Sequence, residues 1–103
     1  MSDPLDRFRS VPATWDEVKE RMRHGEAIRP LLEKVASDGT KWMTVYRSKA
    51  NPSDLWAVEF PYSEAHGGGP LCFYPIEAED AKAWLAQAEP FTDKLRREAG
   101  YWV

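Results

Sequence analysis

The chain has 103 residues, 43% of them apolar, which is enough for one domain with a hydrophobic core. Its net charge is −3 and no third of the sequence carries more basic than acidic residues, which argues against a nucleic acid partner. No apolar run approaches the roughly 18 residues of a membrane span, and the start "MSDPLDRFRS" lacks the apolar centre of a signal peptide. The single cysteine, Cys72, excludes an internal disulfide. We expect one cytoplasmic domain, residues 1–103, with no membrane partner.

The first segment, residues 1–13, contains two prolines and shows no hydrophobic periodicity. This pattern predicts an extended arm that enters the domain and packs Leu5 and Phe8 loosely.

Residues 15–24 carry a clear helix pattern. Thr14 and Glu17 form a T-x-x-E capping box, in which hydroxyl and carboxylate each accept a hydrogen bond from a free backbone N–H. Apolar residues recur on one stripe at Trp15, Val18 and Met22. Gly25 is placed to end the helix.

Residues 27–36 fit two structures. Their apolar residues suit a helical face, and Pro30 is tolerated in a first turn. However, Asp38-Gly39 is also a hairpin turn signal, which would make the segment a strand. We favour the helix and leave the strand as the alternative.

Three strand-like runs follow, at about 41–48, 54–62 and 70–76, rich in β-branched and aromatic residues. In the second run, aromatic and β-branched residues alternate with the rest, which places them on one face of a strand. Pro75 indicates that the third run ends there or lies at a sheet edge. Connections of fewer than ten residues cannot hold a crossover helix, so we predict an antiparallel meander.

The C-terminal part returns to helix, at about 77–89 and 92–100. Acidic residues at the start of the first helix suit its positive end. Pro90 separates the two helices, and Thr92 is placed to cap the second. The predicted fold class is α+β, with helices packed on a three-stranded antiparallel sheet.

The sequence contains no complete catalytic or metal-binding set. Cys72 and His66 flank a glycine run and could approach each other, but a small residue in an apolar strand is ordinarily a core residue. No spacing of His, Cys, Asp and Glu supplies a metal site. The run "HGGGP" leads into a strand rather than a helix and lacks the GK[ST] ending of a phosphate loop. We expect no enzyme activity and no cofactor.

The stretch "VYRSKANPSDLWAVEFPYSEAHGGGPLCFYPI" has a more specific pattern. The motif begins just before this stretch, and its elements are Trp42, Tyr46-Arg47, Trp56, Glu59, Ser63-Glu64 and His66 through Pro70. On these residues the chain resembles the bacterial immunity protein 27 family, which neutralises polymorphic or contact-dependent toxins. It departs from the family pattern at Phe60-Pro61, where a Tyr-Pro pair is expected, and at Leu71, where a second proline is expected.

The resemblance implies a small non-enzymatic inhibitor that binds and occludes a protein partner, such as a cognate toxin. A phage-type inhibitor that binds a subunit of a bacterial defence complex is an alternative. A less favoured alternative is a small ligand-binding or enzymatic domain that uses the glycine loop. Whether that loop is only a turn or faces the partner stays open. The candidate partner-binding residues are Asp54, Glu59, Tyr62, Ser63, Glu64, His66, Gly67, Gly68 and Gly69.

Overall fold

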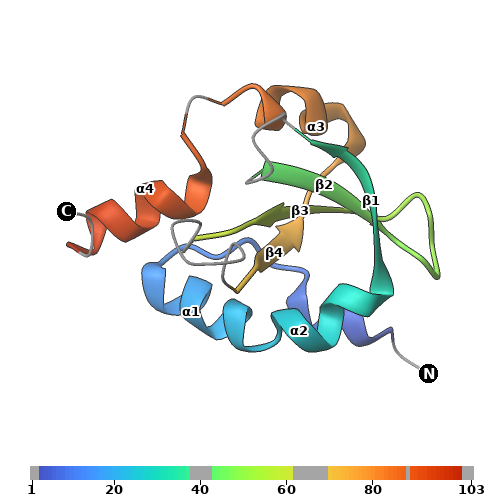
Figure 1. Ribbon diagram of the computed structural model, residues 1–103, viewed down its shortest axis with the longest axis horizontal. Coiled ribbons are helices and arrows are strands. Elements are labelled where there is room, and N and C mark those ends of the chain that lie inside the picture. Colours follow the sequence, from blue (N-terminus) through green and yellow to red (C-terminus); the bar gives the residue numbers. More distant parts are fainter. Residues whose placement is uncertain (1–2, 38–42, 62–69, 88, 101–103) are drawn as a thin grey trace.

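The computed structural model describes residues 3–37, 43–61, 70–87 and 89–100, which form an α+β domain (Figure 1). Its sheet has four antiparallel strands in the order β1-β2-β3-β4, a continuous meander. The predicted meander is therefore confirmed, but its count of three strands is one too few. The strands are β1 Leu32–Ser37, β2 Met43–Ser48, β3 Leu55–Glu59 and β4 Cys72–Pro75. The helices are η1 Pro4–Phe8, α1 Trp15–Arg23, α2 Gly25–Ile28, η2 Arg29–Leu31, α3 Ala78–Leu85 and α4 Phe91–Glu98.

The additional strand, β1, occupies the second half of the segment that we predicted as a helix at 27–36. Helix persists only as the single turn α2 and the 3-10 turn η2, which holds Pro30. Leu32 then adopts an extended backbone, with φ −116° and ψ 150°. From there β1 pairs with β2, beginning with Leu32 opposite Ser48. Pairing with β2 gives partners to backbone groups on the inner side of this strand, and this outweighed the local helical pattern. The turn signal at Asp38-Gly39 lies outside the described residues.

The N-terminal segment is not the extended, loosely packed arm that its prolines suggested. Asp3 caps the 3-10 helix η1, and Leu5 is 0% exposed. Arg21 of α1, itself buried, ties the segment down by donating hydrogen bonds to the carbonyl oxygens of Phe8 and Ser10. It also donates to the Phe73 carbonyl of β4, at 2.8 Å, so one guanidinium joins three parts of the chain. Burial lowers the pKa of Arg21.

Helix α1 begins as the sequence predicts and ends differently. The Thr14 hydroxyl accepts from the Glu17 N–H and the Glu17 carboxylate accepts from the Thr14 N–H, so both hydrogen bonds of the capping box are present. The C-cap is His24, whereas Gly25 is the buried first residue of α2. A Cβ at Gly25 would lie 2.8 Å from the carbonyl oxygen of Leu71. Glycine therefore permits close approach of two backbones here and does not stop α1.

Each face of the sheet carries its own hydrophobic cluster, because successive strand residues point to opposite sides. One cluster gathers Val45, Ala57 and Tyr74 from three neighbouring strands, with side chains from α1, α3 and α4. The other gathers Trp56, Val58 and Phe73, with side chains from η1 and α2. The alternation predicted for the second strand is thus confirmed, and apolar side chains pack against both faces of the sheet.

The two C-terminal helices are confirmed within a few residues of the predicted bounds, with Pro90 between them. Pro90, not Thr92, holds the N-cap position of α4, so the predicted cap is displaced by two residues. Figure 1 shows α3 and α4 apart from each other along the long axis of the domain. In the described part of the chain, no helix combines the length and apolar character that crossing a membrane requires.

We predict that Leu5→Ala lowers the free energy of unfolding by about 3 kcal/mol, because it leaves a cavity under η1. Urea denaturation of both proteins measures the difference. Val11→Ala is the control, since Val11 is 51% exposed in the same segment and should change stability by less than about 0.5 kcal/mol. Equal effects of the two substitutions would contradict the burial of the N-terminal segment.

Candidate functional site

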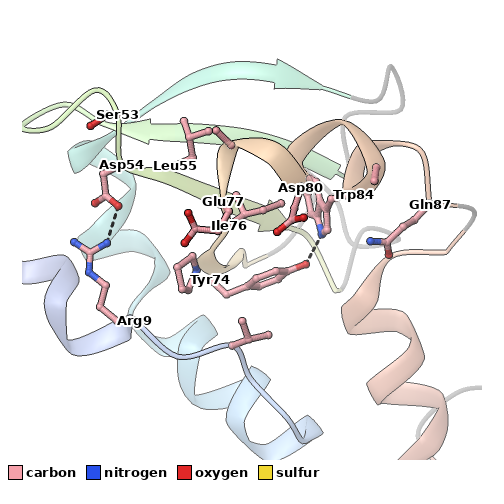
Figure 2. A pocket seen from close by; sticks show the side chains of 14 residues that line it. Arg9, Ser53, Asp54, Leu55, Tyr74, Ile76, Glu77, Asp80, Trp84 and Gln87 are labelled. Carbon is pink, nitrogen blue, oxygen red and sulfur yellow. Dashed lines mark hydrogen bonds and ion pairs between the residues drawn. The ribbon is translucent and has the colours of Figure 1, made fainter.

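An open groove of about 880 Å³ lies where four parts of the chain meet (Figure 2). These are the segment after η1, the turn between β2 and β3, the end of β4 and helix α3. Its lining combines apolar side chains with three carboxylates and one guanidinium. The lining residues are Arg9, Val11, Ser53, Asp54, Leu55, Tyr74, Pro75, Ile76, Glu77, Ala78, Asp80, Ala83, Trp84 and Gln87.

Asp54 is the one residue among the described partner-binding candidates that lines this groove. Its carboxylate pairs with Arg9 at 2.6 Å and accepts a hydrogen bond from the Trp56 indole N–H at 3.1 Å. The Arg9 guanidinium lies over the Trp56 ring, 5.0 Å from its centroid, and also pairs with Asp6. The hydrogen bond to Asp54 is the main reason that the pKa of Arg9 is raised. Asp54 therefore joins the N-terminal segment to the sheet, and its side chain is only 15% exposed.

The inner wall of the groove is fixed by a pair of aromatic residues. The Trp84 indole N–H donates to the Tyr74 hydroxyl at 2.6 Å, and the two rings meet edge to face with centroids 6.2 Å apart (Figure 2). Both side chains are buried, and burial, followed by the nearby charge of Glu59, raises the pKa of Tyr74. Two large side chains held by a hydrogen bond form a rigid surface at low entropic cost on binding.

Glu59 lies beneath this wall, in the protein interior. Its side chain is 0% exposed and accepts a hydrogen bond from the Tyr74 hydroxyl. The other carboxylate oxygen accepts from the Thr92 backbone N–H at 2.9 Å and from the Thr92 hydroxyl at 2.7 Å. Glu59 thus accepts a hydrogen bond from a backbone N–H at the start of α4, which is the capping role that we had expected of the Thr92 side chain.

Burial raises the pKa of Glu59, and the hydrogen bonds from Tyr74 and Thr92 oppose this rise without cancelling it. All of its described contacts are internal. Glu59 therefore supports the groove from below and does not belong to the surface that a partner would meet.

The rest of the candidate set, Tyr62, Ser63, Glu64, His66 and Gly67 through Gly69, lies outside the described residues, and its role in partner binding stays a prediction. The structure does describe the two ends of this segment. The Pro61 carbonyl accepts a hydrogen bond from Arg96 of α4 at 3.0 Å. At the other end, the Leu71 backbone packs against Gly25 of α2. Both ends of the glycine segment are therefore attached to helices.

Cys72 is a core residue, as its apolar strand predicts. It is buried in the cluster that contains Val45 and Ala57, and burial raises the pKa of its thiol to about 12. A thiol with such a pKa is almost entirely protonated at neutral pH and is a poor nucleophile. Within the described ranges, no three His, Cys, Asp or Glu side chains are grouped so that they could hold a metal ion.

The sequence did not identify most of the groove. Glu77 and Asp80 were read as residues that complement the start of a helix, and both do stand at the start of α3. Glu77 is the N-cap residue, yet its side chain makes no capping hydrogen bond. Only the structure shows that the Glu77 carboxylate occupies the N-cap position without accepting a hydrogen bond from the helix backbone. Arg9 and Trp84 come from segments far apart in the chain, and no local pattern connects them.

Fold and groove together define a small α+β domain with an open groove on one face. The chain belongs to the immunity protein 27 family, whose model, described as "Immunity protein 27", matches residues 13–76. This confirms the resemblance seen in the sequence motif. The matched span runs from α1 to β4, so η1, α3 and α4 lie outside it. No curated protein and no solved structure matches the chain.

We predict that Glu59 makes the protein less stable as pH rises. In the unfolded chain a Glu carboxyl has a pKa of about 4.3. Because folding raises the pKa of Glu59, the folded state binds the proton more tightly. The contribution of Glu59 to stability is therefore fully present below about pH 4.3 and is lost as pH rises through the folded pKa. Glu59→Gln should therefore show a weaker loss of stability between pH 4 and 8, measured by urea denaturation.

Glu33→Gln is the control for loss of a carboxylate, since Glu33 is exposed on β1. It should retain the wild-type dependence on pH. The same pH profile in Glu59→Gln and in wild type would contradict the raised pKa.

Proposed function

We propose that this chain is an immunity protein that binds a bacterial toxin and occludes the surface the toxin needs for its activity. The family match over residues 13–76 is the observation that carries this proposal. Inhibition is by binding alone, with no substrate turned over.

The dimensions of the domain suit such a role. A stable protein–protein interface covers about 800 Å² on each partner. The accessible surface of the chain is 6354 Å², so an interface of that size would use about one eighth of it. A partner can therefore be covered by one face while the rest of the domain stays solvated. The net charge of −3 favours encounter with a basic partner, mainly through the association rate.

The shape of the described surface supports binding without large rearrangement. Buried hydrogen bonds join β3, β4, α3 and α4, and the Arg9–Asp54 pair holds the N-terminal segment against the sheet. A surface that is already ordered loses little conformational entropy when a partner binds, which favours tight inhibition.

The test is protection of a bacterial host that expresses the toxin domain encoded beside the gene for this chain. We expect co-expression of the chain to restore growth. A toxin of the same activity from an unrelated locus is the control and should still kill. Death in the presence of soluble, folded chain would refute neutralisation of that toxin. Protection that instead requires a host defence complex as target would favour the phage-type alternative.

Titration of the purified toxin separates occlusion from enzymatic inactivation. We expect toxin activity to fall in proportion to added chain and to reach its minimum at a molar ratio near one. Complete loss of activity at a small fraction of one equivalent, increasing with time, would indicate turnover and contradict a non-enzymatic inhibitor.

A further inference from the structure

We propose that the groove between the N-terminal segment and α3 receives a segment of the toxin that carries a basic residue next to a large apolar one. This places the toxin interface on the face shown in Figure 2 and rests on the proposed function. We call this face the α3 groove; its members used below are Val11, Asp54, Glu77, Asp80 and Trp84.

Apolar side chains line part of this groove, beside its carboxylates. Val11, at 51%, is one of two large hydrophobic residues that the described chain exposes, and it lines the groove. Leu55, Ile76 and Trp84 line it as well. The volume of about 880 Å³ exceeds that of one side chain and suits a short segment. A partner side chain that fills it would remove apolar surface from water, which is the main source of affinity at the centre of an interface.

The charges of the groove indicate the sign of the charge that its occupant carries. Arg9, the one basic residue in the described lining, is already paired with Asp54 and Asp6. Glu77 and Asp80 form no ion pair with any residue that the structure describes. The groove therefore presents uncompensated negative charge beside its apolar wall. An acidic or neutral segment would leave these carboxylates desolvated and unpaired, whereas Lys or Arg would pair with them.

A series of hydrogen-bonded side chains holds the wall behind the groove. Trp84 donates to Tyr74, Tyr74 donates to Glu59, and Glu59 caps α4 through Thr92. This series of hydrogen bonds keeps Trp84 and the start of α3 in place before a partner arrives. The backbone that carries Glu77 and Asp80 is consequently held in place, which favours recognition of a defined partner geometry.

Paired substitutions on α3 test the charge. Asp80→Lys and Glu79→Lys change the net charge equally and remove an acidic residue from the same first turn, but only Asp80 lines the groove. We measure the affinity of each variant for the toxin domain encoded beside the gene, inactivated in its active site, by isothermal titration calorimetry. We expect Asp80→Lys to weaken binding at least about tenfold and Glu79→Lys to change it less than about threefold.

A second pair tests the groove outside the helix, where a substitution does not affect helix formation. Val11 and Val35 are similarly exposed, at 51% and 49%, but Val35 lies on the edge strand β1 and does not line the groove. Val11→Lys introduces a charge of the same sign as the proposed occupant and should weaken binding at least about tenfold. Val35→Lys should bind as wild type does. Thermal unfolding of all four variants confirms that they are folded.

The outcomes separate this proposal from the function on which it rests. If wild type binds the toxin and each groove variant binds as tightly as its control, the α3 groove is not the interface, while the proposed function stands. If wild type does not bind the toxin at all, both fail. If Val11→Lys and Asp80→Lys instead convert a wild-type dimer to a monomer, measured by light scattering, the occupant is a second copy of the chain and the proposal is overturned.

Discussion

The arrangement of this domain depends on one buried carboxylate. Glu59, at the end of β3, accepts three hydrogen bonds in the interior, from the Tyr74 hydroxyl and from the hydroxyl and backbone N–H of Thr92. The start of α4 is attached to the sheet through these contacts, and Tyr74 extends them to Trp84 in α3. Burying a carboxylate costs free energy unless its oxygens accept hydrogen bonds. The hydrogen bonds to Glu59 therefore fix the relative positions of two strands and two helices.

This constraint also explains how the segments beyond the family match belong to the domain. The matched span ends at residue 76, before α3 and α4. Glu59 and Tyr74 lie within the span, whereas Trp84 and Thr92 lie beyond it. On the other face of the sheet, Arg21 performs a comparable task, since it attaches the segment that precedes the span to β4. Thus polar groups inside the matched region hold the flanking helices, and the α3 groove forms where both flanking parts meet it.

Those features that depend on short-range chemistry were predictable from the sequence. The capping box at Thr14 and Glu17 and the alternation along β3 each involve residues close in the chain, so their patterns were sufficient. The structure of segment 27–36 was not predictable in this way. A short apolar run fits the periodicity of a helix and that of a strand, and only pairing with β2 decides between the two.

The groove required tertiary information throughout. A glutamate is expected at the surface, so nothing in the sequence placed Glu59 in the interior. Likewise, the acidic residues at the start of α3 had a sufficient local explanation in the helix dipole. Among the candidates that the structure describes, only Asp54 lines the groove, although its main described contacts are internal.

One consequence follows from the irregular edge of the sheet. β1 has no neighbour on its outer side within the described sheet, and a regular outer strand of this kind can pair with a copy from another molecule and begin ordered aggregation. Here the register with β2 shifts between Lys34 and Ala36, at exposed Val35, and the preceding Glu33 and Lys34 are charged and exposed. A bulge bends the strand, and charges on it disfavour edge-to-edge pairing. The domain can therefore reach a high concentration without polymerising through the β1 edge of its sheet.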